Sequence, residues 1–398
     1  MICSERSRLN FFTGNRLSRA NASFCAIMLA LAVVAAGCGG SHHNHFQPHH
    51  FSFSTSGGIW VANGSDVLEF TPPFTSRTPN IAPSVIVTNS DGFNSTQGVL
   101  FDTAGDLWVI DGGNLAGKPI GENPVSPDPA LEEFTAAQLA GGGSLNLIPA
   151  VTITNTVDSG EGTLGFPQQA VFDSTGNMWV TDNSTGAVDV FSADQLTTTQ
   201  DVSPFAQLTA TGSNLFAGPL GIAFDSSGDL WVANNGDTDI FEFDATTVAT
   251  VLSTGGPNLA VPDVVLSTSS SSIEGPWALI FDPLGDLISS NANTPFTVVA
   301  FLAADLTVSG SPTPRATLSS VNVKGVPSLN SPNGIALDSF NDLAVANSLS
   351  PFSIAIYSAS QAPGAPKPNL SLKPEVLISG SSTLLAAPAG DVFGPQIP

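Results

Sequence analysis

The sequence predicts an all-β fold, a six-bladed β-propeller of four-stranded antiparallel blades. Three observations lead to this prediction: a hairpin motif occurs six times, two further strand-like segments follow each copy, and the copies are spread along residues 51–398. Repeats of this kind cannot bury an apolar face alone, so they stack as solenoids, propellers or arrays. A closed ring protects the edges of its sheets, which favours the propeller.

Each copy of the motif is an apolar strand, a polar turn and a second apolar strand. In the turn Asp225–Asp229 the first carboxylate can cap the turn, and Gly228 supplies the positive φ of a tight loop. Asn341 replaces this glycine in the sixth copy, and Asn also tolerates the left-handed region. The first acids of the turns, Asp102, Asp173, Asp225, Asp282 and Asp338, are therefore predicted to form turns, with metal binding as the alternative. The six copies are Phe51–Asn63, Val99–Asp111, Ala170–Asp182, Ile222–Asn234, Leu279–Asn291 and Ile335–Asn347.

The second strand of each hairpin is apolar on both faces. In Leu230–Ala233 no alternation between apolar and polar residues survives, which is typical of a strand buried on both sides. A blade that lies between two neighbours provides that environment. Trp60, Trp108, Trp179 and Trp231 share one register in these strands, so they are predicted to pack between blades.

Two more strands are predicted in each repeat. The third-strand segments end in Phe or Tyr: Val67–Phe70, Leu131–Phe134, Ala187–Phe191, Asp239–Phe243, Phe296–Phe301 and Ser353–Tyr357. The fourth-strand segments begin at a proline: Pro83, Pro149, Pro204, Pro262, Pro314 and Pro374. The second repeat also contains a Gly- and Pro-rich insertion at residues 112–129.

Two segments compete for the innermost strand of the first blade. Phe51–Ser54 precedes the second strand directly, as in the other repeats. Pro388–Phe393 near the C-terminus repeats the spacing from proline to Phe that opens the blades, as in Pro219–Phe224. The second alternative would close the ring with the C-terminal segment.

The fourth repeat carries a family resemblance. Gly221–Asn234, followed by Asp239–Phe243, resembles an NHL repeat, with its Gly-hydrophobe-Ala start, Gly-Asp turn, Val-Ala-Asn strand end and third strand ending in Phe. The resemblance covers residues 51–380 and implies the same six-bladed propeller. Many NHL repeats place an Arg before the third strand, whereas Ala187 and Thr238 stand near that position in this sequence. The basic ring with which some members bind RNA is therefore not expected.

Residues 1–37 are predicted to be a lipoprotein signal peptide. An arginine-bearing start precedes the apolar run Phe24–Ala36, which is shorter than the roughly 20 residues of a membrane-spanning helix. The small residues before Cys38 resemble the bacterial lipobox, although Ala35 stands where Leu is usual. The resemblance implies that Cys38 carries the lipid; an ordinary secretory signal is the alternative. Gly39 and Gly40 offer no acidic retention cue, which favours the outer membrane of the cell envelope.

Residues 38–50 form the predicted tether, and they contain all five histidines of the chain. Loose capture of a transition metal and a flexible polar spacer are the two interpretations of this His-rich segment. The predicted propeller, residues 51–398, contains neither histidine nor cysteine. Imidazole chemistry and an internal disulfide are thereby excluded from it.

The chain is strongly acidic, and it is too apolar to be disordered. It has 398 residues, a formal net charge of −23, 42% hydrophobic residues and 11% charged residues. Residues 1–37 hold four of the arginines, so the remainder is more acidic still. Phosphate backbones and anionic headgroups require basic patches. Nucleic acid is therefore excluded as a partner, and a membrane is expected to be reached through the lipid anchor only.

Oxygen-bearing side chains end the second strands or precede the first strands, so they are expected on one face of the ring. The predicted site there consists of Asp111, Asp182, Asn234, Glu274 and Asn333, roofed by residues 112–129. Carboxylate and amide oxygens suit Ca²⁺ rather than zinc, so Ca²⁺ is the candidate cofactor. Three crowded carboxylates would repel one another unless a cation or protons intervened. The alternative is that these residues are turn formers that never meet.

No P-loop, Gly-x-Ser-x-Gly elbow, HExxH motif or cysteine pair occurs in the sequence. The sequence therefore favours a surface-anchored platform that binds or scaffolds a protein or small ligand. The alternative is a Ca²⁺-dependent hydrolase or lyase similar to the gluconolactonase-type six-bladed propellers. Streptogramin lyase resembles these repeats too, but its catalysis depends on histidine, which argues against that activity in this chain.

Overall fold

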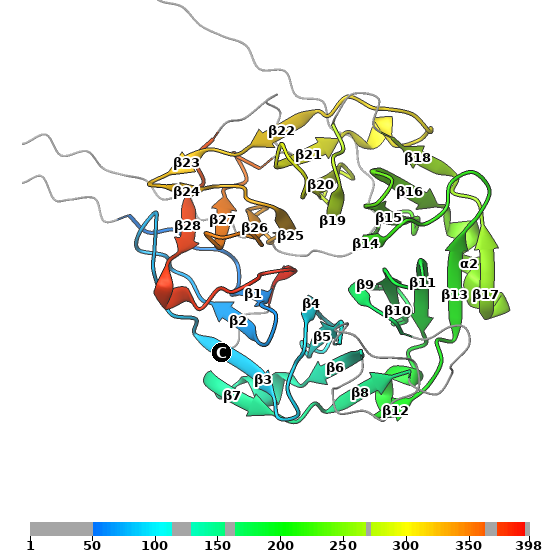
Figure 1. Cartoon of the computed structure of the whole chain (residues 1–398), viewed down its shortest axis with the longest axis horizontal. Helices are drawn as coiled ribbons and strands as arrows, with labels where there is room; N and C mark the ends of the chain where they lie inside the picture. Colours follow the sequence, from blue (N-terminus) through cyan, green and yellow to red (C-terminus); the bar gives the residue numbers. More distant parts are fainter. Residues whose placement is uncertain (1–50, 114–128, 156–163, 268–271, 363–371, 395–398) are drawn as a thin grey trace, which may run out of the picture. The chain divides into compact units, whose positions relative to one another are not determined.

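The repeats form six small sheets arranged as the blades of a ring (Figure 1). The structure is a computed structural model that describes residues 51–113, 129–155, 164–267, 272–362 and 372–394. All of them belong to one compact unit, residues 50–398. The signal peptide, Cys38, the histidines and most of the 112–129 insertion lie outside the described residues. The prediction of an all-β six-bladed propeller is confirmed.

Each blade begins with an inner strand at the channel and ends with an outer strand at the rim. Blade 1 contains β29 (Asp391–Phe393), β1 (Ile59–Ala62), β2 (Val67–Phe70) and β3 (Val85–Asn89). Blade 2 contains β4 (Thr96–Phe101), β5 (Leu107–Asp111), β6 (Ala130–Phe134) and β8 (Val151–Thr154). Blade 3 contains β9 (Pro167–Phe172), β10 (Met178–Asp182), β11 (Ala187–Phe191) and β13 (Ala206–Ala210).

Blade 4 contains β14 (Pro219–Phe224), β15 (Leu230–Asn234), β16 (Asp239–Phe243) and β18 (Val264–Leu266). Blade 5 contains β19 (Pro276–Phe281), β20 (Leu287–Asn291), β21 (Thr297–Phe301) and β22 (Ala316–Ser319). Blade 6 contains β25 (Pro332–Leu337), β26 (Leu343–Asn347), β27 (Ser353–Tyr357) and β28 (Val376–Ser379). Neighbouring strands within these sets of four pair antiparallel, as predicted.

The turn between the first and second strands is stabilised by an Asp cap at its start and a residue with positive φ near its end. Asp225 Oδ1 accepts hydrogen bonds from the backbone N–H groups of Ser227 at 2.8 Å and Asp229 at 3.0 Å. Gly228 has φ +86°, and Asn341 takes the equivalent left-handed conformation with φ +63°. Asp102, Asp173, Asp282 and Asp338 make the same two bonds. The predicted turn-forming role is confirmed.

The last residue of each turn holds the end of the third strand. Asp229 Oδ1 accepts the backbone N–H of Ala245 at 2.7 Å, two residues after the strand-ending Phe243. The other four turns repeat this bond: Asp106 with Ala136, Asn177 with Ala193, Asp286 with Ala303 and Asp342 with Ala359. The hairpin and the third strand are thus joined by a polar clamp in five blades.

The hydrophobic core is divided among the six interfaces between neighbouring blades. Four of these interfaces contain a tryptophan that packs edge-to-face on the Phe at the end of the next blade's inner strand. These pairs are Trp60 with Phe101, Trp108 with Phe172, Trp179 with Phe224 and Trp231 with Phe281, at centroid distances of 5.6, 6.3, 5.6 and 6.0 Å. Each such pair contributes about 0.5–1.5 kcal/mol beyond area burial. The predicted packing of tryptophan between blades is confirmed.

The C-terminal segment closes the ring. Strand β29 pairs antiparallel with β1, with Trp60 opposite Val392. Hydrogen bonds from Ala389 N–H to Ala62 O at 2.9 Å and from Ala62 N–H to Gly390 O at 2.8 Å extend the pairing. Phe53, from the competing segment, instead bridges to Phe74. Blade 1 therefore combines strands from both ends of the described chain.

Three blades gain a fifth strand that the sequence did not predict. The segment between the third and fourth strands of one blade reaches back and pairs in parallel with the outer strand of the preceding blade. These strands are β7 (Gly143–Leu147) on β3, β12 (Gln200–Asp201) on β8 and β17 (Gly256–Ala260) on β13. Helices α1 (Ala136–Leu139) and α2 (Ala245–Thr254) lie in two of these segments. The outer edges of blades 1 to 3 are thereby covered.

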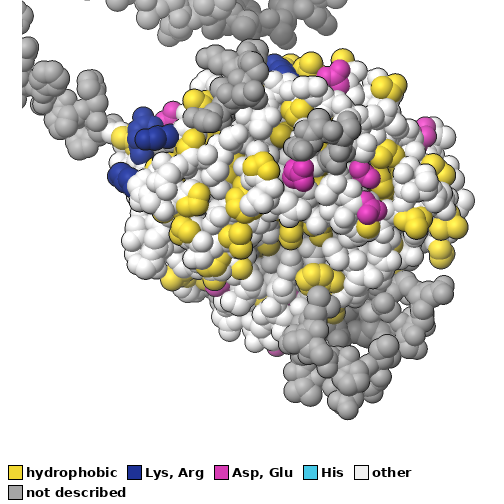
Figure 2. Space-filling model, turned by 45° about the horizontal axis from the view of Figure 1, so that its top comes forward, with side chains coloured by type: hydrophobic (Ala, Val, Ile, Leu, Met, Phe, Trp, Pro, Cys, Tyr) yellow, Lys and Arg dark blue, Asp and Glu magenta, His cyan; other side chains and the backbone are white. Residues whose placement is uncertain are grey.

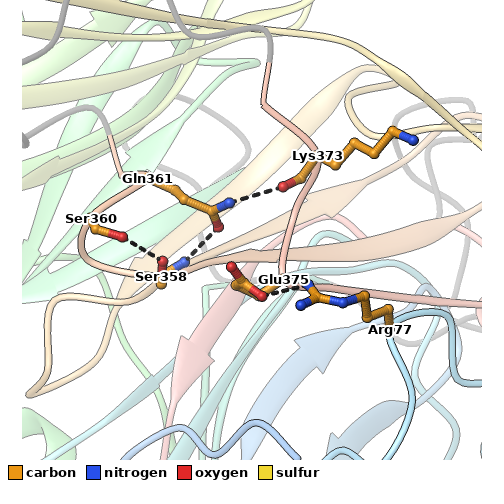
Figure 3. A network of polar contacts seen from close by, with 6 residues as sticks. All are labelled: Arg77, Ser358, Ser360, Gln361, Lys373 and Glu375. Carbon is orange, nitrogen blue, oxygen red and sulfur yellow. Dashed lines mark hydrogen bonds and ion pairs between the residues drawn. The ribbon is translucent and has the colours of Figure 1, made fainter. Parts of the chain in front are cut away.

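A polar seam lies between blades 6 and 1. Leu377 and Ser379 of β28 donate backbone hydrogen bonds to the carbonyl oxygens of Arg77 and Pro79 at 2.9 and 3.1 Å. The Arg77 guanidinium also pairs with Glu375 at 2.6 Å (Figure 3). Because the Arg77 side chain is 62% exposed, this ion pair contributes little to stability. The backbone hydrogen bonds are the main contacts of the seam.

Candidate functional site

The second strands end on one face of the ring, which we call the loop face, and the residues at their ends, or directly after the end in blade 1, form a buried polar ring. The ring consists of Asn63, Asp111, Asp182, Asn234, Asn291 and Asn347, none more than 2% exposed. A buried polar group costs free energy unless it is hydrogen-bonded. The partners of these six side chains therefore decide what the ring can do.

Both carboxylates of the ring accept hydrogen bonds from backbone N–H groups of the loops. Asp182 accepts hydrogen bonds from the N–H groups of Gly165 and Phe166, in the connector that enters blade 3, and from Ser184. Asp111 uses its two oxygens in the same way, with Asn94, Ser95 and Gly113 as donors at 2.9–3.0 Å. Each carboxylate thus holds the incoming connector of its own blade.

The asparagines act through both ends of the amide. Asn347 Oδ1 accepts the N–H of Asn330 at 2.8 Å, and its Nδ2 donates to Ser328 O at 3.1 Å. Asn234 joins Ala217 N–H and Leu215 O, and Asn291 joins Glu274 N–H and Ser272 O. The polar ring therefore clamps the connectors between blades onto the second strands.

The five predicted Ca²⁺ ligands are distributed one to a blade. Asp111, Asp182 and Asn234 end the second strands of blades 2, 3 and 4, Glu274 lies in the connector entering blade 5, and Asn333 lies on β25 of blade 6. Among the described residues, the carboxylates of Asp111, Asp182 and Glu274 do not form a group with oxygens within 4.8 Å of one another. Calcium binding at the loop face stays a prediction.

The central channel has a volume of about 370 Å³ and is lined mainly by aliphatic side chains of the inner strands. Gln169 of blade 3 donates from Nε2 to Asn333 O of blade 6 at 3.4 Å, so its amide spans the channel. Asp391 stands where the other inner strands have Val99, Ala170, Ile222, Leu279 and Ile335. Its carboxyl oxygens have no hydrogen-bond partner among the described residues, and burial raises the pKa of Asp391 well above its usual range.

Two buried acids lie behind the loop face, on the third strands of blades 2 and 3. Glu132 accepts a hydrogen bond from Asn89 Nδ2 at 2.6 Å, and Asp189 accepts one from Gln207 Nε2 at 2.8 Å. Burial, with the charges of Asp111 and Asp182 adding to it, raises the pKa of Glu132 and of Asp189 to about 8. Burial therefore favours the protonated, uncharged form of both carboxyls.

Sequence reasoning missed these two acids, although a signal exists. They occupy the third-strand position that is Leu68, Phe241, Val299 and Ala355 in the other blades. An acid at an otherwise apolar repeat position is the anomaly that would have marked them.

The described residues include only four lysines and arginines, Arg77, Arg315, Lys324 and Lys373. In Figure 2 they gather at the rim of the visible face, whose middle shows acidic and hydrophobic side chains. Arg315 is neutralised by Asp286, and Lys324 donates to Thr78 at 3.1 Å. This distribution favours a neutral or cationic ligand over an anionic one.

Comparison with known proteins places the chain by fold alone. No protein-family model matches it, and no curated protein matches it in sequence. A structure of a protein of unknown function from Bacteroides caccae shares 9% identity with a TM-score of 0.51, covering 86% of this chain and all of the other. A protein from Lactobacillus plantarum shares 13% identity with a TM-score of 0.49 over 85% of this chain and 99% of the other. Virginiamycin B lyase from Staphylococcus aureus shares 12% identity with a TM-score of 0.38 over 67% of each chain.

Proposed function

We propose that this protein is an exported, envelope-anchored propeller whose loop face binds a neutral or cationic ligand, either a protein or a small molecule. One observation carries the proposal: the buried polar ring is hydrogen-bonded to the connectors and holds them in place. A surface built from loops held in this way is preorganised, and preorganisation lowers the entropic cost of binding.

Site-specific photo-crosslinking in the native host tests the loop-face proposal. A photoreactive residue would replace Thr185 or Asp237, exposed on the loop face, or Ser174 or Ser227, exposed on the opposite face. The expected result is a discrete adduct from the loop-face positions only. Adducts of equal yield from both faces, or from neither, would refute the assignment of the binding surface.

The proposed anchor rests on Cys38 and the apolar run before it. No helix among the described residues is long and apolar enough to span a membrane. Cys38→Ala should move the protein from the membrane fraction to the soluble fraction of the envelope, and mass spectrometry should find lipid on Cys38 of the parent protein. A variant that stays in the membrane fraction would contradict lipid anchoring.

The alternative function, a Ca²⁺-dependent hydrolase or lyase, uses the predicted loop-face ligands. Its test is a thermal-shift titration with Ca²⁺ and chelator on the parent protein and on a triple variant, Asp111→Asn, Asp182→Asn and Glu274→Gln. A Ca²⁺-induced rise in Tm that the triple variant loses supports the alternative. A rise that persists in the variant places the ion elsewhere.

A further inference from the structure

A cleft opens between blades 2 and 3 on the face opposite the loop face, which we call the turn face because the Asp-capped turns lie there. Its volume is about 810 Å³. One wall carries Asp102 and Glu133 of blade 2, and the other carries the turn Asp173–Gly176 of blade 3. Phe101, Trp108 and Phe172 are also among the lining residues. The cleft thus combines carboxylates from both walls with aromatic rings.

Asp102, Asp106 and Glu133 each offer a carboxylate oxygen within 4.8 Å of the other two. Local bonds use only Oδ1 of Asp102 and Oδ1 of Asp106, and no group among the described residues donates to the Glu133 carboxylate. Three negative groups therefore repel one another at this point of the cleft.

The equivalent turns of blades 3, 5 and 6 are satisfied by donors of the chain itself. The turn of blade 4 also lacks such a donor among the described residues, but its carboxylates do not gather within 4.8 Å of one another. In blade 3 the free oxygen of Asp173 accepts from Trp179 Nε1 at 3.1 Å and from Asn177 Nδ2 at 2.8 Å. In blade 5 the Arg315 guanidinium pairs with Asp286. In blade 6 Asp338 Oδ2 accepts the N–H of Ser56 at 2.8 Å. The described part of blade 2 supplies no donor of these kinds to its turn.

A second observation comes from Trp108. It is 2% exposed, lines the cleft and lies opposite Glu133 in the β5–β6 pair, and its indole Nε1 has no hydrogen-bond acceptor among the described residues. The matching indole of blade 3, Trp179, donates to the turn carboxylate. Trp60 and Trp231 also lack an acceptor, but Trp108 is the one that shares a described cleft with the carboxylate group. The indole thus needs an oxygen acceptor where the acids need a positive charge.

We propose that Asp102, Asp106 and Glu133 form a Ca²⁺ site in this turn-face cleft. A hydrated Ca²⁺ ion meets both needs: it brings a positive charge to the carboxylates, and one of its water oxygens can accept the hydrogen bond of the indole N–H. The ligand set is all oxygen, which excludes preference for zinc or copper. Ca²⁺ accepts 6–8 oxygens in irregular geometry, and an open cleft admits the waters that complete the shell. This site is independent of the proposed loop-face function.

Terbium luminescence tests the proposal, because Tb³⁺ takes Ca²⁺ sites and, under excitation that only indoles absorb, is sensitised only by a nearby tryptophan. The full-length protein should show Tb³⁺ emission on indole excitation, and Ca²⁺ should displace it. Trp108→Phe should remove most of this emission. Glu133→Gln, which breaks no hydrogen bond of the described residues, should weaken Ca²⁺ competition by about tenfold or more, because affinity follows the ligand charge count.

The matched control is Glu242→Gln in blade 4, where Glu242 lies opposite Trp231 as Glu133 lies opposite Trp108. This control should leave emission and Ca²⁺ competition unchanged, and circular dichroism should confirm that all variants are folded. Unchanged emission in Trp108→Phe, or unchanged competition in Glu133→Gln, overturns the assignment. Equal losses in the blade 2 and blade 4 variants also overturn it, since they would show only general attraction of cations to an acidic protein.

Discussion

Deleting residues 384–398 should destabilise the propeller strongly, because this segment supplies the strand that closes the ring. Besides the ladder between β29 and β1, six hydrogen bonds are lost: three between backbone groups of Gly58 or Ala62 and the segment, and three between Asn63 and the segment. At about 1 kcal/mol net for each bond, these six alone amount to about 6 kcal/mol. Ile59 and Trp60, both fully buried, also lose their cover.

This loss can be read as a change in melting temperature. An unfolding entropy of about 2 cal/mol/K per residue gives a ring of this size a shift of roughly 1–2 °C per kcal/mol. Differential scanning calorimetry should therefore show Tm lower by about 7 °C or more. Deleting residues 395–398 alone is the control and should change Tm little. A Tm within about 2 °C of the parent after the longer deletion would refute closure by the C-terminal segment.

Three further predictions concern single side chains. The folded pKa values of Glu132 and Asp189, about 8, exceed the values in the unfolded chain. The stability that these groups confer when protonated is therefore complete below about pH 4 and is lost as the pH rises through 8. Tm should fall from pH 5 to pH 9, and it should fall less in the double variant Glu132→Gln and Asp189→Asn. Asp182→Ala should lower the free energy of unfolding in urea by about 2–4 kcal/mol, and Asp182→Asn by less, because connector N–H groups lose their acceptor; equal effects would contradict the clamp. Gly221→Ala should cost about 1–3 kcal/mol, since a Cβ there would lie 2.3 Å from Trp277 O, whereas Gly310→Ala, with no atom within 4 Å, should be neutral; comparable Tm values would reject close packing of the inner strands.

The candidate sites show where sequence reasoning stops. Strand-end oxygens at Asp111 and Asp182 were expected on one face, and they lie there. Whether these carboxylates meet at a common centre or bind the connectors of their own blades depends on the path of the loops that arrive from the preceding blade. Glu132 and Asp189 owe their raised pKa values to burial between blades, which no residue adjacent in sequence reports.

The sequence by itself determined the repeat, the blade count and the hairpin turns of blades 2 to 6, because each of these turns is decided within five residues by an Asp cap and a residue that tolerates positive φ. It also determined the positions of the core tryptophans, since a strand apolar on both faces requires neighbours on both sides. Only the tertiary structure decided that β29 rather than Phe51–Ser54 closes blade 1, and that β7, β12 and β17 cover the edges of preceding blades. These pairings join segments far apart in the chain. They are stabilised by hydrogen bonds to strand edges, and those edges exist only once the blades have formed.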